Sequence, residues 1–141
     1  MENYAFADPA DKLVLIVDDD ASVRELLVFL IKKEGFQLDT AADGEEALRK
    51  SQQLSPDLIL LDLMLPKLGG FEILRELQDD ATAGIPIVII TGRYTERSTS
   101  DMIKQEPNVI EFIEKPLKPQ LLLSAIHKIL KPRPALKKHF N

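Results

Sequence analysis

The sequence contains no cysteine and only two histidines among its 141 residues. The absence of cysteine excludes disulfides, thiolate catalysis and zinc–sulfur sites. The two histidines, His127 and His139, both lie near the C-terminus, which argues against a histidine-based triad or a histidine-rich metal site. These absences leave carboxylate, hydroxyl and amine side chains to carry any chemistry.

Long hydrophobic runs and targeting signals are also missing. No apolar run approaches the roughly 18 residues of a membrane span, and residues 1–11 lack the basic and apolar regions of a signal peptide. No G-x-G-x-x-G follows the first apolar run, which disfavours a dinucleotide binder, and the net charge of −5 weighs against general nucleic-acid binding. We therefore expect one cytoplasmic domain that binds neither membranes nor nucleic acid directly.

Five short apolar runs of strand length alternate with segments of helical periodicity. The runs are Leu13–Val17, Phe36–Ala42, Leu58–Leu61, Ile85–Ile90 and Val109–Ile113. Helices are expected to begin near Asp20 or Ser22, at Asp43, near Phe71, within Thr95–Gln105 and at Pro119. Three runs are nearly continuous in Leu, Ile and Val, which suits parallel strands covered on both faces. The pattern predicts an α/β, (βα)₅ domain with a doubly wound parallel five-stranded sheet.

Polar side chains follow four of the five predicted strands at the same end. Each alone is more often a helix cap, a turn residue or a solvated charge. Open parallel sheets bind ligands outside the carboxyl ends of their strands, so the coincidence favours a common site. The residues are Asp18, Asp19 and Asp20 after the first strand, Asp62 after the third, Thr91 after the fourth and Lys115 after the fifth.

Clustered carboxylates repel one another unless cations compensate them. Lys115 supplies one positive charge, and a hard divalent ion suits the rest, because Mg²⁺ prefers oxygen ligands and leaves positions for phosphate oxygens. Such a site suits phosphoryl transfer to a carboxylate. An aspartate acts as nucleophile, the metal neutralises the phosphate, and lysine and a hydroxyl bind the phosphoryl oxygens.

Four motifs, in order and at similar spacing, resemble those of two-component response-regulator receiver domains. They are Val17-Asp18-Asp19, Leu61-Asp62-Leu63-Met64-Leu65-Pro66 with Gly70, Ile90-Thr91-Gly92, and Phe112-Ile113-Glu114-Lys115-Pro116. The resemblance covers residues 12–131 and implies a chemotaxis-regulator-like fold with the flavodoxin-like strand order 2-1-3-4-5. Residues 1–11 would be an N-terminal extension, and residues 132–141 a basic C-terminal tail or the start of a linker.

The resemblance assigns the phosphoacceptor role to Asp62 and implies the metal ligands. Asp19, Asp62 and the backbone carbonyl of Met64 match direct Mg²⁺ ligands, and Asp18 matches a ligand that acts through water. Mn²⁺ is expected to substitute for Mg²⁺. The domain would catalyse only its own metal-dependent phosphorylation and dephosphorylation, so it is not expected to be an enzyme for an external substrate.

The resemblance also implies which residues bind the phosphoryl group and respond to it. Thr91 and Lys115 match the hydroxyl and the ammonium that bind it, and the Lys115–Pro116 peptide bond is expected to be cis. Phe112 matches the aromatic switch position, where many relatives carry Tyr; an ordinary core aromatic is the alternative. Met64 and Arg93 occupy positions that tune hydrolysis, and the apolar Met64 predicts slow self-dephosphorylation.

The expected partners follow from the same resemblance. The donor would be a sensor histidine kinase or a histidine phosphotransfer protein, and the target a downstream protein, an effector domain or a phosphorylation-dependent homodimer. Segment 95–108 departs from the family pattern, so the sequence does not predict which surface contacts the target. The alternatives are an interaction module that works without phosphorylation and an Asp-nucleophile phosphohydrolase, which would require an acid where Met64 stands.

Overall fold

The structure is a computed structural model that describes residues 8–67, 69–92 and 105–131. Arg93, residues 95–104 of the predicted fourth helix and the basic tail 132–141 lie outside the described residues. The N-terminal segment is described from residue 8, where Pro9–Asp11 form a short 3-10 helix, η1, that Asp8 caps by accepting a hydrogen bond from the Ala10 N–H. Because Gln37 Nε2 of β2 donates a hydrogen bond to the Ala10 carbonyl oxygen at 2.5 Å, residues 8–11 of the predicted extension are folded onto the domain.

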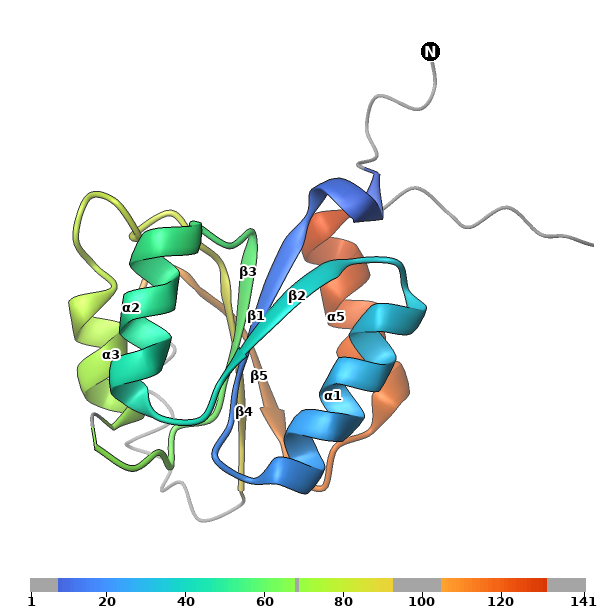
Figure 1. Ribbon diagram of the computed structural model, residues 1–141, viewed down its shortest axis with the longest axis horizontal. Coiled ribbons are helices and arrows are strands. Elements are labelled where there is room, and N and C mark those ends of the chain that lie inside the picture. Colours follow the sequence, from blue (N-terminus) through green and yellow to red (C-terminus); the bar gives the residue numbers. More distant parts are fainter. Residues whose placement is uncertain (1–7, 68, 93–104, 132–141) are drawn as a thin grey trace, which may run out of the picture.

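Five parallel strands form one sheet in the order β2-β1-β3-β4-β5 (Figure 1). The strands are β1 (Leu13–Val17), β2 (Gln37–Ala41), β3 (Leu58–Leu61), β4 (Ile87–Thr91) and β5 (Val109–Glu114). Helices α1 (Ala21–Lys33) and α5 (Pro119–Leu130) cover one face, and α2 (Gly44–Leu54) and α3 (Gly70–Glu76) cover the other (Figure 1). The predicted doubly wound parallel sheet and its strand order are confirmed.

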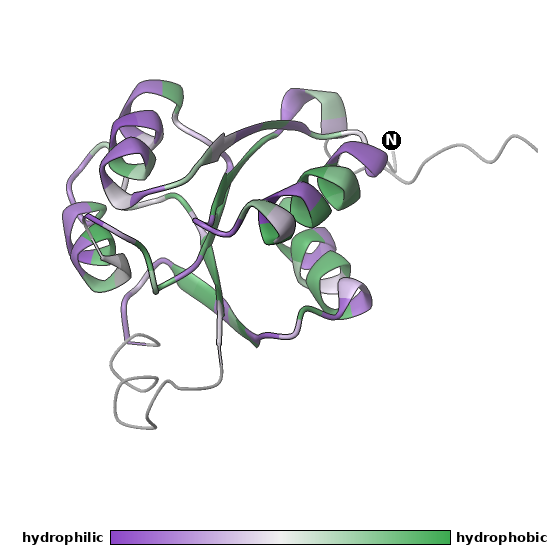
Figure 2. Ribbon diagram, turned by 60° about the horizontal axis from the view of Figure 1, so that its bottom comes forward, coloured by the Kyte–Doolittle hydropathy of each residue, from purple (hydrophilic) through white to green (hydrophobic). Residues whose placement is uncertain are grey.

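The core has two layers because successive side chains of a strand point to opposite faces. Val14 and Ile16 of β1 pack under α1 and α5, whereas Leu15 and Val17 pack under α2 and α3. Figure 2 shows the central strands as hydrophobic along most of their length, while the helices carry hydrophilic segments. Burial on both faces explains why the central strands read as continuous apolar runs.

Three predicted strands differ from the observed ones by one or two residues at an end. The strand predicted at Val109–Ile113 only extends one residue further, to Glu114. The strand predicted at Ile85–Ile90 begins instead at Ile87, because the Ile85 N–H closes a turn onto the Thr82 carbonyl and Pro86 has no N–H to donate. It extends to Thr91, which pairs with β5. Likewise, the strand predicted at Phe36–Ala42 begins one residue later, after a turn at Gly35, whose φ of 92° suits glycine.

Helix starts follow the predicted caps. Asp20 caps α1 by accepting hydrogen bonds from the Ser22 and Val23 N–H groups. Asp43 caps α2 through the Glu46 N–H, at 2.8 Å. The side chain of Glu46 in turn accepts from the N–H of Ala42, one residue before the cap, at 2.9 Å, which gives a variant of a capping box. Pro119 occupies the first turn of α5, as predicted.

Lys50 connects α2 to the edge strand β2. Its Nζ lies 2.9 Å from Asp39 Oδ1, 3.3 Å from Glu46 Oε2 and 2.6 Å from the Thr40 carbonyl oxygen. The Ala42 N–H and then Lys50 hold the pKa of Glu46 below its ordinary value, although burial opposes this. Burial alone would raise the pKa of Asp39, but the hydrogen bonds from Lys50 and the Thr40 N–H hold it below its ordinary value.

Replacing Lys50 with methionine should therefore destabilise the domain in a pH-dependent way. Because both carboxyl pKa values are lower in the folded state than the ordinary 3.8 and 4.5, their stabilisation is present above those ordinary values and is lost as the pH falls below them, through the lowered folded-state values. We expect Lys50→Met to cost about 1 kcal/mol at neutral pH and less at pH of about 3, measured by urea unfolding. The exposed Lys32→Met is the control, and an equal loss at both pH values would contradict the assignment.

Candidate functional site

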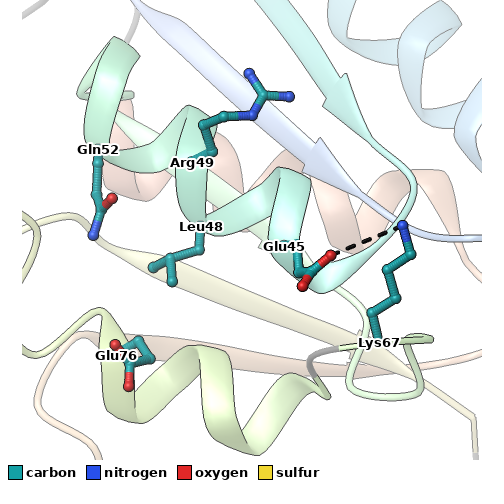
Figure 3. A pocket seen from close by; sticks show the side chains of 6 residues that line it. All are labelled: Glu45, Leu48, Arg49, Gln52, Lys67 and Glu76. Carbon is teal, nitrogen blue, oxygen red and sulfur yellow. Dashed lines mark ion pairs between the residues drawn. The ribbon is translucent and has the colours of Figure 1, made fainter.

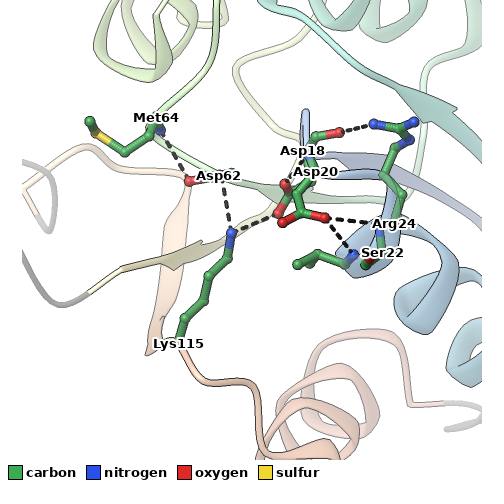
Figure 4. Close-up of polar contacts among 8 residues, drawn as sticks. Asp18, Asp20, Ser22, Arg24, Asp62, Met64 and Lys115 are labelled. Carbon is green, nitrogen blue, oxygen red and sulfur yellow. Dashed lines mark hydrogen bonds and ion pairs between the residues drawn. The ribbon is translucent and has the colours of Figure 1, made fainter.

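Most of the residues predicted to converge lie at the carboxyl edge of the sheet, at the ends of β1, β3, β4 and β5, whereas Asp20 instead caps α1. We call this group the rim: it consists of Asp18, Asp19, Asp62, Thr91 and Lys115. Parallel strands bring these positions together because all their carboxyl ends lie at one edge. Figure 4 shows Lys115 reaching from the end of β5 toward the aspartates that follow β1 and β3.

Lys115 bridges the two buried aspartates of the rim. Its Nζ lies 2.9 Å from Asp18 Oδ2 and 3.1 Å from Asp62 Oδ2 (Figure 4). The exposed fractions are 1% for Asp18 and 4% for Asp62, so both carboxylates have lost most of their contact with water. One ammonium thus offsets two buried carboxylates, and the rim retains an excess of negative charge.

The pKa shifts of Asp18 and Lys115 agree with this excess of negative charge. Burial raises the pKa of Asp18 above its ordinary value, and the negative charge of Asp62 adds to the rise, against opposing hydrogen bonds from the Asp20 N–H and Lys115. Burial alone would lower the pKa of Lys115, but its hydrogen bond to Asp18 and the charges of Asp62 and Asp18 raise it. Lys115 is therefore firmly protonated, and the carboxylates would gain from a further cation.

The described residues include one group of acidic side chains close enough to hold a metal ion. Ligand oxygens of Asp18, Asp19 and Asp62 all lie within 4.8 Å of one another. Asp19 is exposed, whereas the other two are buried, so an ion could enter from the side of Asp19. The donors are all hard carboxylate oxygens, which fits Mg²⁺ or Mn²⁺ and not a metal that prefers sulfur or nitrogen.

Asp62 is held from two sides. Its Oδ1 accepts a hydrogen bond from the Met64 N–H at 3.0 Å, and its Oδ2 accepts the one from Lys115 (Figure 4). The Met64 side chain is 72% exposed, so an apolar group stands at the open side of the site. Asp62 is thus fixed in orientation while its surroundings remain accessible to a reactant.

Thr91 and Lys115 are joined through the backbone. Thr91 is buried, and its carbonyl oxygen accepts a hydrogen bond from the Lys115 N–H at 2.7 Å. The Lys115–Pro116 peptide bond is cis. Phe112 is partly buried and packs against the core layer under α2 and α3. Thr91 thus ends β4, Phe112 lies on the neighbouring strand β5, and Lys115 directly follows β5.

A separate open hollow lies between α2 and α3 (Figure 3). Its lining carries charges of both signs, and Lys67 Nζ lies 3.9 Å from Glu45 Oε1. Opposite charges that pair with each other leave little net field to attract an ion or a phosphate. The chemistry is therefore assigned to the rim, where like charges converge.

The sequence-based prediction missed Arg24. This half-buried residue of α1 donates a hydrogen bond from Nη1 to the main-chain oxygen of Asp18 at 2.8 Å (Figure 4). Its position one turn into the helix, six residues after Asp18, was the only available signal. A side chain that reaches back to a main-chain oxygen leaves no pattern in hydropathy or motif spacing.

Comparison with known proteins identifies the family. The model of the response regulator receiver domain matches residues 14–127, which is most of the chain. The chain belongs to the response regulator receiver domain family. A crystal structure of a CheY-like receiver domain protein from Methanospirillum hungatei has a TM-score of 0.78 and 29% identity, and the match covers 85% of this chain and 94% of that one.

Curated relatives of this receiver domain are longer proteins. The DNA-binding response regulator MtrA of Mycobacterium tuberculosis is 38% identical over 125 residues, which are 88% of this chain and 53% of that protein. The alkaline phosphatase synthesis transcriptional regulatory protein PhoP of Bacillus subtilis is 35% identical, with 86% of this chain and 49% of that protein covered. The receiver domain thus spans about half the length of these relatives.

Proposed function

We propose that the domain is a switch operated by phosphorylation of Asp62. Phosphorylation-driven switching is the general function of receiver domains. The observation that carries the proposal for this chain is the bridge from Lys115 to Asp18 and Asp62, with Asp19 completing a group of three carboxylates. A phosphoryl group on Asp62 would lie beside the one ammonium of the rim.

The donor is a phosphohistidine on a sensor histidine kinase or on a histidine phosphotransfer protein. An oxygen of the Asp62 carboxylate attacks phosphorus, the phosphorus–nitrogen bond breaks, and the imidazole nitrogen leaves with the electron pair and takes up a proton. Lys115, 3.1 Å from Asp62 Oδ2, would bind a phosphoryl oxygen, and the Met64 N–H holds the other carboxylate oxygen in place. The chain's own contribution is positioning and charge.

Mg²⁺ is the proposed cofactor, and Mn²⁺ would substitute for it. When bound, the ion neutralises the charge that a phosphoryl group brings to an already acidic rim. Asp19 and Asp62 would be direct ligands, Asp18 a ligand through water, and the backbone carbonyl of Met64 the third direct protein ligand. The support is the set of carboxylate oxygens of Asp18, Asp19 and Asp62, all within 4.8 Å of one another.

The conformational response would start at Thr91 and Phe112. The Thr91 hydroxyl would move to the phosphoryl group, and the ring of Phe112 would turn inward after it. The two residues lie on adjacent strands, and Phe112 is partly buried at an accessible edge of the core. The rearranged surface would control an effector domain or a separate partner protein, and phosphorylation-dependent homodimers are one form this control could take.

The proposed switch works in the cytoplasm, with no direct contact between this domain and nucleic acid. None of the helices in the described part of the chain has the length and apolar character to span a bilayer. The names of MtrA and PhoP describe DNA-binding and transcriptional regulators. An effector domain of that kind is a natural target for this switch.

The test is phosphorylation by a small-molecule donor. We expect acetyl phosphate with Mg²⁺ to add one phosphoryl group, detected by intact-protein mass spectrometry, and EDTA to prevent it. The site is mapped by borohydride reduction of the aspartyl phosphate and peptide mass spectrometry. A generic phosphate ester should not be turned over. An unmodified protein would favour an interaction module that works without phosphorylation, and ester turnover would favour a phosphohydrolase.

The phosphorylated form should be long-lived because of Met64. Its exposed apolar side chain offers no hydrogen bond to orient an attacking water molecule. Met64→Asn should accelerate decay of the phosphorylated form about fivefold, since one hydrogen bond in the transition state is worth about 1 kcal/mol. Leu54→Asn, at the far end of α2, is the matched control. Decay of the wild-type phosphorylated form within seconds in Mg²⁺ would contradict this prediction. Arg93 is proposed to affect the same hydrolysis of the aspartyl phosphate, and the same decay assay would test its role.

A further inference from the structure

The loop between β1 and α1 is a chain of hydrogen bonds that starts at the rim. Asp18 Oδ1 accepts from the Asp20 N–H at 2.9 Å, and Asp20 Oδ1 accepts from the Ser22 and Val23 N–H groups at 2.8 and 3.3 Å (Figure 4). The carboxylate that faces Lys115 is therefore linked, through the N-cap of α1, to the first turn of the helix. Asp19 is the residue that lies between these two fixed carboxylates.

Arg24 closes this loop from the helix side. Its backbone N–H donates to the main-chain oxygen of Asp20 at 2.9 Å, as the first bond of the helix, and its Nη1 donates to the main-chain oxygen of Asp18 at 2.8 Å. The oxygen of Asp18 belongs to the planar peptide unit that ends at the Cα of Asp19. A guanidinium bound to that oxygen therefore fixes the plane from which the Asp19 side chain projects.

We propose that Arg24 is a positioning residue that orients Asp19 for metal binding. Asp19 is exposed, yet its carboxylate lies within 4.8 Å of the ligand oxygens of Asp18 and Asp62. An exposed carboxylate next to two others is repelled by them, so a fixed backbone is needed to keep it in place before an ion arrives. The inference rests on the proposed function, because it concerns the same metal site.

Positioning and charge predict opposite results when Arg24 is removed. A cation close to the rim repels Mg²⁺, so loss of its charge alone would strengthen binding. Loss of the bond to Asp18 would free the peptide unit before Asp19, and binding would then have to order it again. The sign of the change in Mg²⁺ affinity therefore separates the two roles.

The experiment is an NMR-monitored Mg²⁺ titration of the whole chain. Arg24→Met keeps an unbranched apolar side chain and removes both the charge and the donor. We expect the Mg²⁺ affinity to fall about tenfold, as for other residues that orient metal ligands. Lys32→Met removes one charge from the last turn of the same helix and should leave the affinity unchanged or slightly higher. An affinity of Arg24→Met equal to or higher than that of the wild-type chain would overturn the proposal.

A second background shows whether Arg24 acts through Asp19. In Asp19→Asn, the carboxylate that Arg24 positions is gone, so adding Arg24→Met should reduce Mg²⁺ affinity by much less than in the wild-type background. An equal loss in both backgrounds would show a general effect on the fold and overturn the proposal. All titrations are run below the unfolding temperature of every variant, measured in EDTA. If the wild-type chain itself did not bind Mg²⁺, the proposed function would fail instead.

Discussion

Replacing Asp62 with asparagine should abolish the phosphoryl adduct that acetyl phosphate forms with the wild-type chain. An amide is not a nucleophile toward phosphorus under these conditions, and it brings no charge to a metal ion. The side chain keeps its shape, and its oxygen can still accept the hydrogen bond that the Met64 N–H gives to Asp62 Oδ1 at 3.0 Å. Lys115 keeps its partner Asp18 at 2.9 Å. The variant should therefore fold and yet remain unmodified in intact-mass spectra.

The matched control is Asp57→Asn. Asp57 makes an equally specific contact, accepting a hydrogen bond from the Leu13 N–H at 2.8 Å, but it precedes β3 and so lies at the opposite edge of the sheet from Asp62. The same chemical change there should leave the adduct intact. If Asp62→Asn were modified to the wild-type extent, another residue would be the acceptor, and the proposed function would lose its central residue.

The sequence predicts the sheet well where burial is uniform. The continuous runs Leu13–Val17 and Leu58–Leu61 became β1 and β3 at their predicted bounds, because strands in the middle of a parallel sheet are apolar on both faces. The ends of a strand differ from the prediction where backbone hydrogen bonds, and not burial, determine where the strand begins. Ile85 is buried and apolar, yet it closes a turn, and Pro86 after it has no N–H to donate.

The contacts of the site also fall into a predictable and an unpredictable group. The polar residues at the ends of the predicted strands indicated that Asp18, Asp62 and Lys115 would meet, because the topology brings the carboxyl ends of parallel strands to one edge. The contact from Arg24 to the main-chain oxygen of Asp18 was not predictable, since it depends on the rotamer of one long side chain. Lys50 is similar: helical periodicity places it on α2, but only the structure shows its three contacts to β2 and Glu46.

Replacing Lys115 with methionine should destabilise the metal-free domain strongly. The change leaves Asp18 and Asp62, which are 1% and 4% exposed, without the ammonium that lies about 3 Å from each. Removing one partner of a buried ion pair leaves an uncompensated charge in a medium that solvates it poorly. We expect the free energy of unfolding in EDTA at neutral pH to fall by about 3 kcal/mol, measured by urea denaturation.

The control for this loss is Lys118→Met. Lys118 is exposed, and among the described residues its side chain makes no capping hydrogen bond to α5, so its removal should change the free energy of unfolding by less than about 0.5 kcal/mol. Equal stability of Lys115→Met and the wild-type chain in EDTA would show that the rim tolerates its charges without Lys115.

Two additions should restore stability to Lys115→Met, each by lowering the negative charge of the rim. Asp18→Asn in the same chain removes one of the two buried carboxylates, so the double variant should be more stable than Lys115→Met alone. Mg²⁺ should also raise its free energy of unfolding, because an ion that binds only the folded state stabilises that state. Asp18→Asn should weaken this response to Mg²⁺, since it removes one of the three carboxylates of the metal group. If Asp18→Asn restored stability but Mg²⁺ did not, charge repulsion within the rim would still explain the instability of Lys115→Met. The rim would then not be a metal site.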